Sequence, residues 1–402
     1  MTFKNITSLL TPANTKIVML VMDGLGGLPI VPGGLTELET AKTPHMDRLA
    51  AEGTLGQTLP IDYGVTPGSG PAHLSLFGYD AVEHEVGRGV LEALGVGMYV
   101  HRGDVAARGN FCTVDAAGLI SDRRAGRIPT EEAEPIVEKL KAIQFPGVTI
   151  EVKHVKEYRF AVVIRGAGLN PELEDTDPER TGVAPLDVVA RVPEAQSTAD
   201  LFNRWIEEAR KILKNEKKAN CLTLRGFATD PRLEHFKERY DLRAACVAVY
   251  PMYKGVATLV GMDVISFPGE LPRDEFAAVE KIWNDYDFFF VHIKKTDSYG
   301  EDGDFNHKVG IIEGVDEALP ELLKLKPDVL IITGDHSTPA KLKSHSWHPV
   351  PFVLWAPATV RPDDQTQFGE RACARGGFGT MKAIEAMPLA LAHAQRLTKF
   401  GA

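Results

Sequence analysis

Cysteine and long apolar runs are both scarce in this chain. The cysteines are Cys112, Cys221, Cys246 and Cys373 among 402 residues, and no two form a Cys-x-x-Cys pair. Their number and spacing argue against a disulfide framework and against a thiolate zinc site. No apolar run reaches the roughly 18 residues that a membrane helix needs, and the first residues do not resemble a secretory signal. We therefore expect a cytoplasmic protein with no membrane partner.

The chain also lacks an excess of positive charge. Its 45 lysines and arginines are outnumbered by 55 aspartates and glutamates, which gives a net charge of −10. Nucleic-acid binding relies on basic side chains that neutralise backbone phosphates, so we expect no nucleic-acid partner. An anionic small molecule would have to be bound by a local basic pocket. With 44% hydrophobic residues, the chain is long enough to bury two cores of ordinary domain size.

Apolar runs and helical spacing predict an α/β core. Strands covered on both faces are predicted at residues 16–22, 287–293, 328–333 and 351–355. Helices are predicted at residues 43–53 and 308–325, the second with a possible kink at Pro320. Strands that alternate with helices indicate a mainly parallel sheet.

The middle of the chain has shorter strand candidates and predicts an inserted second α/β domain. Its elements are strands at residues 149–155, 158–165 and 248–250 and an amphipathic helix at 197–214, while glycine-rich segments at 31–34, 87–97 and 375–379 are predicted to be turns. We place the core at residues 1–85 and 250–402 and the inserted domain at 86–249.

Two buried strands are followed by residues that commonly bind metals. Asp23 follows the first strand, and Asp335 and His336 follow the strand at 328–333. Open α/β sheets bind ligands at the carboxyl ends of their strands. Oxygen and nitrogen ligands suit a divalent ion such as Mn²⁺, Mg²⁺ or Zn²⁺. The alternative for each motif alone is a helix cap or a turn.

A second acidic segment follows the strand at 287–293. Asp297, Glu301 and His345 could form a second ion site at the same edge. The alternative is a solvated acidic loop. The rival ligands in this part of the sequence are Asp302, Asp304, His307 and His348.

Ser69 lies in a Gly-Ser-Gly-Pro turn that is predicted to open a helix. A serine at a helix amino terminus meets unpaired N–H groups and a dipole that favours negative charge. Beside a divalent ion its hydroxyl would be a nucleophile. The alternative is an N-cap serine.

Basic residues concentrate in the central region. Arginine binds phosphate and carboxylate bidentately, so the group indicates a pocket for a small phosphorylated acid. For each arginine alone, surface solvation is the alternative. The group comprises Arg123, Arg124 and Arg127, with Arg88, Arg102, Arg108, Arg225 and Lys254 elsewhere in the same region.

Several short motifs are spread along the chain. They are Val21-Met22-Asp23-Gly24, Pro67-Gly68-Ser69 with His73-Leu74, Phe77-Gly78-Tyr79-Asp80, Gly87-Arg88-Gly89, Asp122-Arg123-Arg124-Ala125-Gly126-Arg127, Asp175-Thr176-Asp177-Pro178, Tyr250-Pro251-Met252-Tyr253-Lys254-Gly255, Gly334-Asp335-His336-Ser337-Thr338-Pro339 and His345-Ser346-Trp347-His348-Pro349-Val350-Pro351. Together these motifs resemble the archaeal-type cofactor-independent phosphoglycerate mutases. The resemblance runs from about Lys16 to the carboxyl terminus.

The resemblance implies an alkaline phosphatase-like metal-binding core with an inserted α/β domain that closes over the substrate. It implies two divalent ions, with Mn²⁺ expected and Mg²⁺, Zn²⁺ or Co²⁺ as alternatives. One ion would be bound by Asp23, Ser69, Asp335 and His336, and the other by Asp297 and His345. The chain departs from many archaeal-type sequences by having Glu301 where they have histidine, and a carboxylate there would favour harder ions.

The resemblance also implies an isomerase that converts 3-phosphoglycerate to 2-phosphoglycerate through a phosphoserine on Ser69, without 2,3-bisphosphoglycerate. It implies contacts to the transferring phosphoryl group from Lys254 and to substrate anions from Arg88, Arg123, Arg127 and Arg225. His73 would bind phosphate, transfer a proton or anchor the helix. The alternatives are a phosphatase or phosphopentomutase with the same metals, and a non-catalytic protein that binds a phosphorylated metabolite. The sequence makes no prediction of the oligomeric state.

Overall fold

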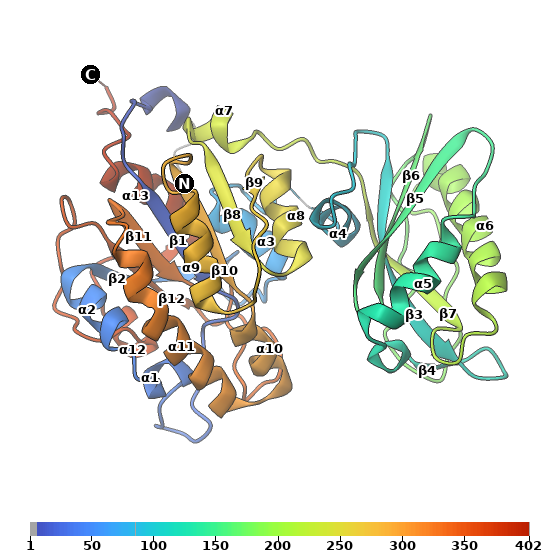
Figure 1. Cartoon of the computed structure of the whole chain (residues 1–402), viewed down its shortest axis with the longest axis horizontal. Helices are drawn as coiled ribbons and strands as arrows, with labels where there is room; N and C mark the ends of the chain where they lie inside the picture. Colours follow the sequence, from blue (N-terminus) through green and yellow to red (C-terminus); the bar gives the residue numbers. More distant parts are fainter. Residues whose placement is uncertain (1–5, 85, 402) are drawn as a thin grey trace. The chain divides into compact units, whose positions relative to one another are not determined.

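The chain forms two compact units (Figure 1), seen in a computed structural model that describes residues 6–84 and 86–401. Unit 1 comprises Met1–Glu85, Leu233–Tyr250 and Val260–Ala402, and unit 2 comprises Val86–Arg232 and Pro251–Leu259. The predicted return to the core at residue 250 differs from this division. Residues 233–250 belong to unit 1 because they include a strand of its sheet, and residues 251–259 belong to unit 2 because they form a helix packed within it.

Unit 1 is built on an eight-stranded sheet with the order β13-β2-β12-β11-β1-β10-β8-β9. β1 lies between β10 and β11 and runs parallel to both, while β12 is antiparallel to its two neighbours. The predicted α/β fold with a mainly parallel sheet is therefore confirmed. The strands are β1 (Ile17–Met22), β2 (Thr54–Leu59), β8 (Ala244–Ala248), β9 (Asp263–Val264), β10 (Phe288–Ile293), β11 (Val329–Thr333), β12 (Val350–Trp355) and β13 (Gly379–Lys382).

Helices surround this sheet. The longer ones are α2 (Pro44–Glu52), α3 (Ser69–Leu76), α9 (Pro272–Lys281), α10 (Lys295–Asp302), α11 (Phe305–Leu323) and α13 (Ala386–His393), and the shorter ones are α1 (Glu37–Thr40), α7 (Phe236–Tyr240) and α12 (Glu370–Cys373). Two 3₁₀ turns, Ile6–Leu9 and Ala383–Glu385, complete unit 1 among the described residues.

The central strands are apolar on both faces because helices cover both. On one face, Val18 and Leu20 of β1 share a core with residues of α2, α9 and α11 (Figure 1). On the other face, Phe290 of β10 packs edge-on against Phe77, which follows α3, with 4.8 Å between ring centroids. This coverage of both faces explains why the strands are apolar at consecutive positions, the pattern that predicted them.

Unit 2 contains a five-stranded antiparallel sheet with the order β4-β3-β6-β5, in which β7 also pairs with β3. Its strands are β3 (Val105–Val114), β4 (Ile120–Asp122), β5 (Val148–Lys156), β6 (Arg159–Gly166) and β7 (Cys221–Ala228). Its helices are α4 (Arg88–Gly95), α5 (Thr130–Leu140), α6 (Gln196–Leu213) and α8 (Pro251–Leu259), with 3₁₀ turns at Ala125–Arg127 and Pro193–Ala195. Helices α5 and α6 pack on one face of the sheet, around Phe160 and Trp205 (Figure 1).

The predicted turn at residues 87–97 is wrong, because most of it forms α4. Its glycines serve close packing. A Cβ on Gly89 would lie 2.4 Å from the carbonyl oxygen of Ala106 on β3, and one on Gly95 would lie 1.9 Å from that of Pro251 on α8. Only glycine lets the helix approach these backbones.

Two further local predictions differ from the structure. The strand predicted at 248–250 ends at Ala248 and begins at Ala244, where it pairs with β10 in unit 1. The acidic segment after β10 is the helix α10 and not a loop. Pro320 lies inside α11, which continues to Leu323.

Within residues 6–84 and 86–401, no helix combines the length and the apolarity that crossing a bilayer requires.

Candidate active site

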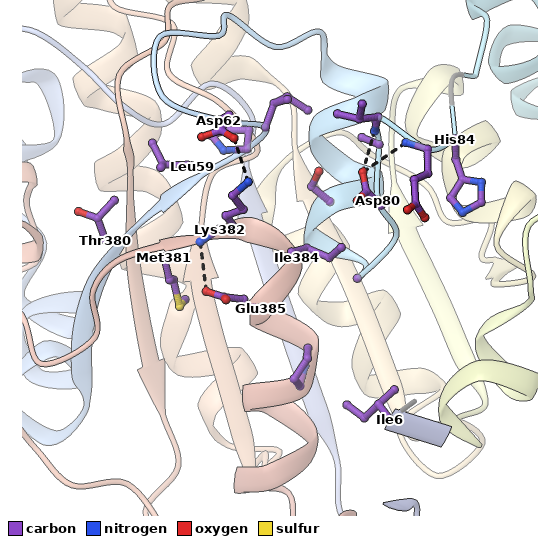
Figure 2. Close-up of a pocket in the computed structure, with 18 of the residues that line it drawn as sticks. Ile6, Leu59, Asp62, Asp80, His84, Thr380, Met381, Lys382, Ile384 and Glu385 are labelled. Atoms are coloured by element: carbon purple, nitrogen blue, oxygen red, sulfur yellow. Dashed lines mark hydrogen bonds and ion pairs between the residues drawn. The ribbon is translucent and has the colours of Figure 1, made fainter. Parts of the chain in front are cut away.

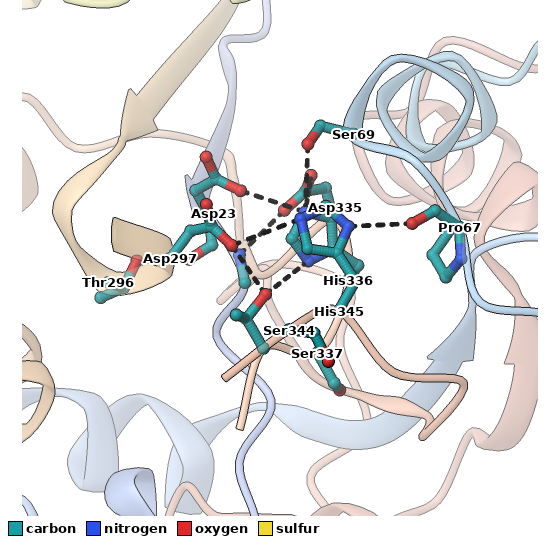
Figure 3. Close-up of polar contacts among 12 residues, drawn as sticks. Asp23, Pro67, Ser69, Thr296, Asp297, Asp335, His336, Ser337, Ser344 and His345 are labelled. Carbon is teal, nitrogen blue, oxygen red and sulfur yellow. Dashed lines mark hydrogen bonds and ion pairs between the residues drawn. The ribbon is translucent and has the colours of Figure 1, made fainter. Parts of the chain in front are cut away.

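Three neighbouring strands bring the predicted metal ligands to one edge of the unit 1 sheet. β1 and β10 end in register at Met22 and Ile293, and Val21 pairs with Thr333 of β11. Because these strands are parallel, their carboxyl ends meet at the same edge. Asp23, Asp297, Asp335 and His336 follow these ends and lie together with Ser69 (Figure 3).

The first ligand cluster consists of Asp23, Asp335 and His336, and all three side chains are fully buried. Nε2 of His336 lies 3.3 Å from Oδ1 of Asp23 and 3.2 Å from Oδ2 of Asp335. The same nitrogen lies 3.2 Å from Oγ of Ser69. Three oxygen atoms therefore surround one imidazole nitrogen.

The hydrogen bonds of Thr338 determine which nitrogen of His336 carries the proton. The Thr338 hydroxyl donates to Oδ1 of Asp297 at 2.7 Å, so its oxygen must accept from Nδ1 of His336 at 3.0 Å. Burial lowers the pKa of His336 well below its ordinary value, so the ring is neutral. Its Nε2 lone pair then faces the carboxylates and Ser69, as it would in a metal ligand.

The second ligand cluster consists of Asp297, His336 and His345. Nε2 of His345 lies 3.6 Å from Oδ1 of Asp297, while its Nδ1 donates to the carbonyl of Pro67 at 2.9 Å. The His345 ring stacks on the His336 ring with 3.7 Å between centroids. Its second nitrogen is thus also turned toward a carboxylate, and His336 belongs to both clusters.

The charges at the first cluster are compatible with a cation and unfavourable without one. Burial, and then repulsion from Asp23, raises the pKa of Asp335 well above its ordinary value. Its Oδ2 is buried and accepts no hydrogen bond from the residues that the structure describes. Two carboxylates and an imidazole lone pair directed at one another fit a divalent ion.

Ser69 is the first residue of α3, and its side chain does not cap the helix. The N-cap is Gly68, which makes no side-chain bond, and the Ser69 hydroxyl instead faces His336. The N-cap alternative for Ser69 therefore does not hold in this structure. Ser69 is nearly buried, at 6% exposure.

His73 lies beneath Ser69 and has no exposed surface. Its Nδ1 donates to the Ser69 carbonyl at 2.8 Å and lies 3.2 Å from Oδ2 of Asp335. Burial lowers the pKa of His73 to about 4, so the ring is neutral near pH 7. These contacts agree with the alternative in which His73 anchors the helix. A direct contact with substrate would require an exposed surface, which His73 lacks in this structure.

Glu301 lies on α10 one turn after Asp297, and its side chain is exposed. Partial desolvation, and then repulsion from Asp297, raises its pKa. Neither ligand cluster in the described part of the chain includes it or the rival ligands. Among the rivals, His307 pairs with Asp304 at 2.6 Å on the surface, and Nδ1 of His348 contacts Oγ of Ser346 at 3.0 Å.

The predicted substrate-binding arginines lie in unit 2, and two of them are held by acidic side chains. Arg123 donates from Nε and Nη2 to the two carboxylate oxygens of Asp177, at 3.1 and 2.8 Å. Arg225 contacts Asp175, Asp177 and Glu179. These contacts fix the two guanidinium groups. Arg88 and Arg127 are exposed, and the partly buried Lys254 lies on α8.

A pocket of about 710 Å³ elsewhere in unit 1 contains none of the predicted site residues (Figure 2). It is lined in part by Asp62, Asp80 and Lys382, and the last donates to Asp62 at 2.9 Å. The candidate metal ligands therefore lie outside this cavity.

Comparison with known proteins assigns the family. A family model described as 2,3-bisphosphoglycerate-independent phosphoglycerate mutase matches residues 50–219. A protein of Aquifex aeolicus named "Probable 2,3-bisphosphoglycerate-independent phosphoglycerate mutase" is 48% identical over 406 residues, covering 99% of each chain. A protein of Thermus thermophilus with the same name is 50% identical over 392 residues, covering 96% of each chain. The chain belongs to this mutase family.

A solved structure agrees with this assignment. The "Cofactor-Independent Phosphoglycerate mutase from Thermoplasma Acidophilum" is 30% identical, with a TM-score of 0.70, and the match covers 94% of this chain and 100% of that one. A protein structure from Pyrococcus horikoshii is 32% identical, with a TM-score of 0.83, over 96% of this chain and 99% of that one. The predicted family and the predicted enzyme class, an isomerase, are confirmed.

In this mutase, the buried Glu37 and the partly buried Glu370 hold the segment that follows β1. Glu37 accepts from the backbone N–H groups of Leu28 and Ala340, at 3.1 and 2.8 Å. Glu370 accepts from the Gly27 N–H at 2.9 Å and from the Thr36 hydroxyl at 2.5 Å. The segment carrying Asp23 is thereby fixed.

Replacing Glu370 with glutamine is expected to remove a pH-dependent loss of stability. Burial raises the pKa of Glu370 to about 7. Because the folded state holds this proton more tightly than the unfolded state, wild-type stability falls as pH rises from about 4.5 to about 7. E370Q should lack this fall. The free energy of unfolding of E370Q, compared with that of wild type, should therefore be more favourable at pH 8 than at pH 5 by on the order of 1–3 kcal/mol. Urea unfolding at both pH values measures it.

The exposed Glu280 provides the control, since E280Q should leave the wild-type pH dependence intact. Equal pH dependence in E370Q and wild type would mean that Glu370 is not the titrating group.

Sequence reasoning missed several residues that organise the site. Thr338, Lys294 and Lys308 each contact a ligand or a ligand-bearing segment. The only sequence signals were the position of Lys294 three residues before Asp297, and a lysine at position 308 in the apolar stripe of a helix. The Asp-Thr-Asp-Pro motif at 175–178 is visible in the sequence, but its pairing with the arginines appears only in the structure.

Proposed function

We propose that this mutase interconverts 3-phosphoglycerate and 2-phosphoglycerate through a phosphoserine formed on Ser69, with the help of two divalent ions. The observation that carries the proposal concerns Nε2 of His336, whose lone pair is free for a metal. Carboxylate oxygens of Asp23 and Asp335 and the Ser69 hydroxyl all lie within 3.3 Å of this nitrogen. Asp23, Ser69, Asp335 and His336 would hold one ion. Asp297 and His345 would hold the other, with Glu301 as a further ligand. Mn²⁺ is the proposed metal, with Mg²⁺, Zn²⁺ and Co²⁺ as alternatives.

When bound, the ions would lower the pKa of the Ser69 hydroxyl and neutralise charge on the phosphoryl group. Ser69 supplies the nucleophile. Its Oγ forms a bond to phosphorus as the bond to the C3 oxygen of 3-phosphoglycerate breaks, leaving glycerate. The C2 hydroxyl of glycerate then attacks the phosphoserine, which breaks the Oγ–phosphorus bond and gives 2-phosphoglycerate. The proton lost from one hydroxyl in each step is matched by one gained at the departing oxygen.

The position of Ser69 at the start of α3 serves both transfers. Unpaired N–H groups in the first turn of a helix bind phosphate oxygens, and the helix dipole favours their charge. His73 holds the Ser69 carbonyl, so the hydroxyl is presented from a fixed backbone. A fixed nucleophile lowers the entropic cost of reaching the in-line geometry.

The basic residues of unit 2 are proposed to bind the anionic groups of the substrate. Arg123 and Arg225 are oriented by Asp177, and oriented guanidinium groups bind carboxylate or phosphate with little loss of side-chain entropy. Arg88 and Arg127 are proposed as further substrate contacts, and Lys254 as a contact of the transferring phosphoryl group. The substrate would be a small molecule of the cytoplasm.

The test is an isomerisation assay on the pure protein. With Mn²⁺ and 3-phosphoglycerate but no 2,3-bisphosphoglycerate, phosphorus NMR should show 2-phosphoglycerate appearing until equilibrium, and a chelator should stop the reaction. Release of inorganic phosphate in place of 2-phosphoglycerate would favour a phosphatase. Activity on a pentose phosphate alone would favour a phosphopentomutase. Binding without turnover would favour a non-catalytic role.

A further inference from the structure

Lys294 is a cation placed between the two ligand clusters. It follows β10 directly and is the N-cap residue of α10. Its Nζ donates to Oδ2 of Asp23 at 2.9 Å and to Oδ2 of Asp297 at 2.5 Å. Asp23 belongs to one cluster and Asp297 to the other. One ammonium group therefore connects the two candidate metal sites.

Each of the two carboxylates bonds Lys294 through Oδ2 and turns Oδ1 toward a candidate ligand imidazole. Oδ2 of Asp23 and Oδ2 of Asp297 accept from the ammonium group, and Oδ2 of Asp23 also lies 3.7 Å from Nε2 of His292. Oδ1 of Asp23 faces His336 at 3.3 Å, and Oδ1 of Asp297 faces His345 at 3.6 Å. Each carboxylate thus has one oxygen on the side of a candidate ligand imidazole and the other bonded to the lysine, and Oδ1 of Asp297 also accepts from Thr338.

Charge explains why a lysine is needed here. Asp23 is fully buried and Asp297 is 2% exposed. Burial opposes ionisation of Asp23, but the Lys294 ammonium, together with smaller contributions from nearby histidines, holds the pKa of Asp23 below its ordinary value. Lys294 is partly buried, whereas Lys308 in the same region is fully buried and donates to backbone carbonyls instead. Two buried carboxylates without a counter-ion would repel each other and turn apart.

We infer that Lys294 is a positioning residue that locks both ligand carboxylates with one oxygen each toward the metal, and so couples the two sites. This inference rests on the proposed two-metal function. Side chains that orient metal ligands typically change metal affinity about 10- to 100-fold when they are removed. Because Lys294 holds a ligand of each cluster, its loss weakens both sites together.

The test compares K294M with wild type in Mn²⁺ binding, measured by calorimetry on chelator-treated protein. The expected result is a dissociation constant raised about 10- to 100-fold for both ions. The exchange-coupled Mn²⁺ electron paramagnetic resonance signal of the two-ion site should weaken at equal loading. Unchanged affinity for both ions, or loss at one site only, would overturn the inference. Tighter binding would overturn it too, because it would mean that the ammonium competes with the metal.

Lys295 provides the matched control. It is the next residue and is exposed. K295M removes the same charge close to the site, so a general electrostatic effect would change both variants alike. We expect K295M to bind Mn²⁺ like wild type, and K294R, which keeps the charge, to recover part of the affinity. Equal effects in K294M and K295M would count against positioning.

A measurement on wild type does not depend on the variant folding. Amine acylation read by mass spectrometry should leave Lys294 protected relative to Lys295 both with Mn²⁺ and with chelator, because the ammonium stays on the two Oδ2 atoms. Exposure of Lys294 on metal loading would show displacement and overturn the inference. Failure of the proposed function is a separate result, namely wild type that binds Mn²⁺ without isomerising 3-phosphoglycerate.

Discussion

Replacing Ser69 with alanine is expected to lower kcat for isomerisation by about 10⁴-fold or more while leaving 3-phosphoglycerate binding measurable. Removal of a nucleophile abolishes the covalent route but not the groups that bind the substrate. The substitution deletes one oxygen atom and no helix cap, since the N-cap of α3 is Gly68. The fold should therefore survive. Steady-state kinetics with Mn²⁺ and calorimetric titration of 3-phosphoglycerate measure the two effects.

Ser75 lies on the same helix and is also buried, so S75A is the matched control and should keep wild-type turnover within a few-fold. Mass spectrometry of protein quenched during turnover should locate phosphate on Ser69 in wild type and in S75A, and none in S69A. Wild-type turnover in S69A, or phosphate on another residue, would remove Ser69 from its proposed role.

Much of the core, and the place of the candidate ligands at one sheet edge, could be predicted because the signals are local. A buried parallel strand is apolar at successive positions, and the polar residue directly after it lies at the carboxyl edge whatever the rest of the chain does. Asp23 and Asp335 were found in this way. The strands at 17–22 and 329–333 were predicted to within one residue.

The parts that could not be predicted depend on contacts between distant residues. The glycines of α4 predict a turn from the sequence alone, because their close contacts with Ala106 and Pro251 appear only in the structure. Which nitrogen of His336 carries the proton depends on Thr338, whose hydroxyl donates to Asp297 and accepts from Nδ1 of His336. The sequence around Lys294 also does not show that its ammonium group bonds one oxygen of Asp23 and one of Asp297. The directions in which these side chains point depend on the folded arrangement and not on the residue types alone.

Replacing Lys308 with methionine is expected to destabilise the protein by about 3–5 kcal/mol. Lys308 on α11 has no exposed surface, and burial lowers the pKa of its amine. Its Nζ donates to the carbonyls of Gly24, Gly26 and Thr338, at 2.9, 3.2 and 2.9 Å. Methionine fills the same space but leaves these oxygens without the ammonium. Urea unfolding in chelator, at constant pH, measures the change in the free energy of unfolding.

The side chain of Lys324, the C-cap residue of the same helix, is 68% exposed and donates to Glu321 at 3.0 Å. K324M should therefore cost less than about 1 kcal/mol. A loss in K308M no larger than that in K324M would show that the three carbonyls find other partners at little cost.

The same substitution should also weaken metal binding, because the three carbonyls belong to the segments that carry the ligands. Gly24 follows Asp23 directly, and Thr338 contacts both His336 and Asp297. Oε1 of Glu37 lies 4.0 Å from Nζ of Lys308, so K308M also leaves a buried carboxylate without its cation. The double variant K308M/E37Q removes that charge and should recover part of the stability but not the Mn²⁺ affinity. If both recover, Lys308 supports Mn²⁺ binding through its pairing with Glu37. If stability alone recovers, Lys308 supports Mn²⁺ binding by holding the loops that carry Asp23 and His336.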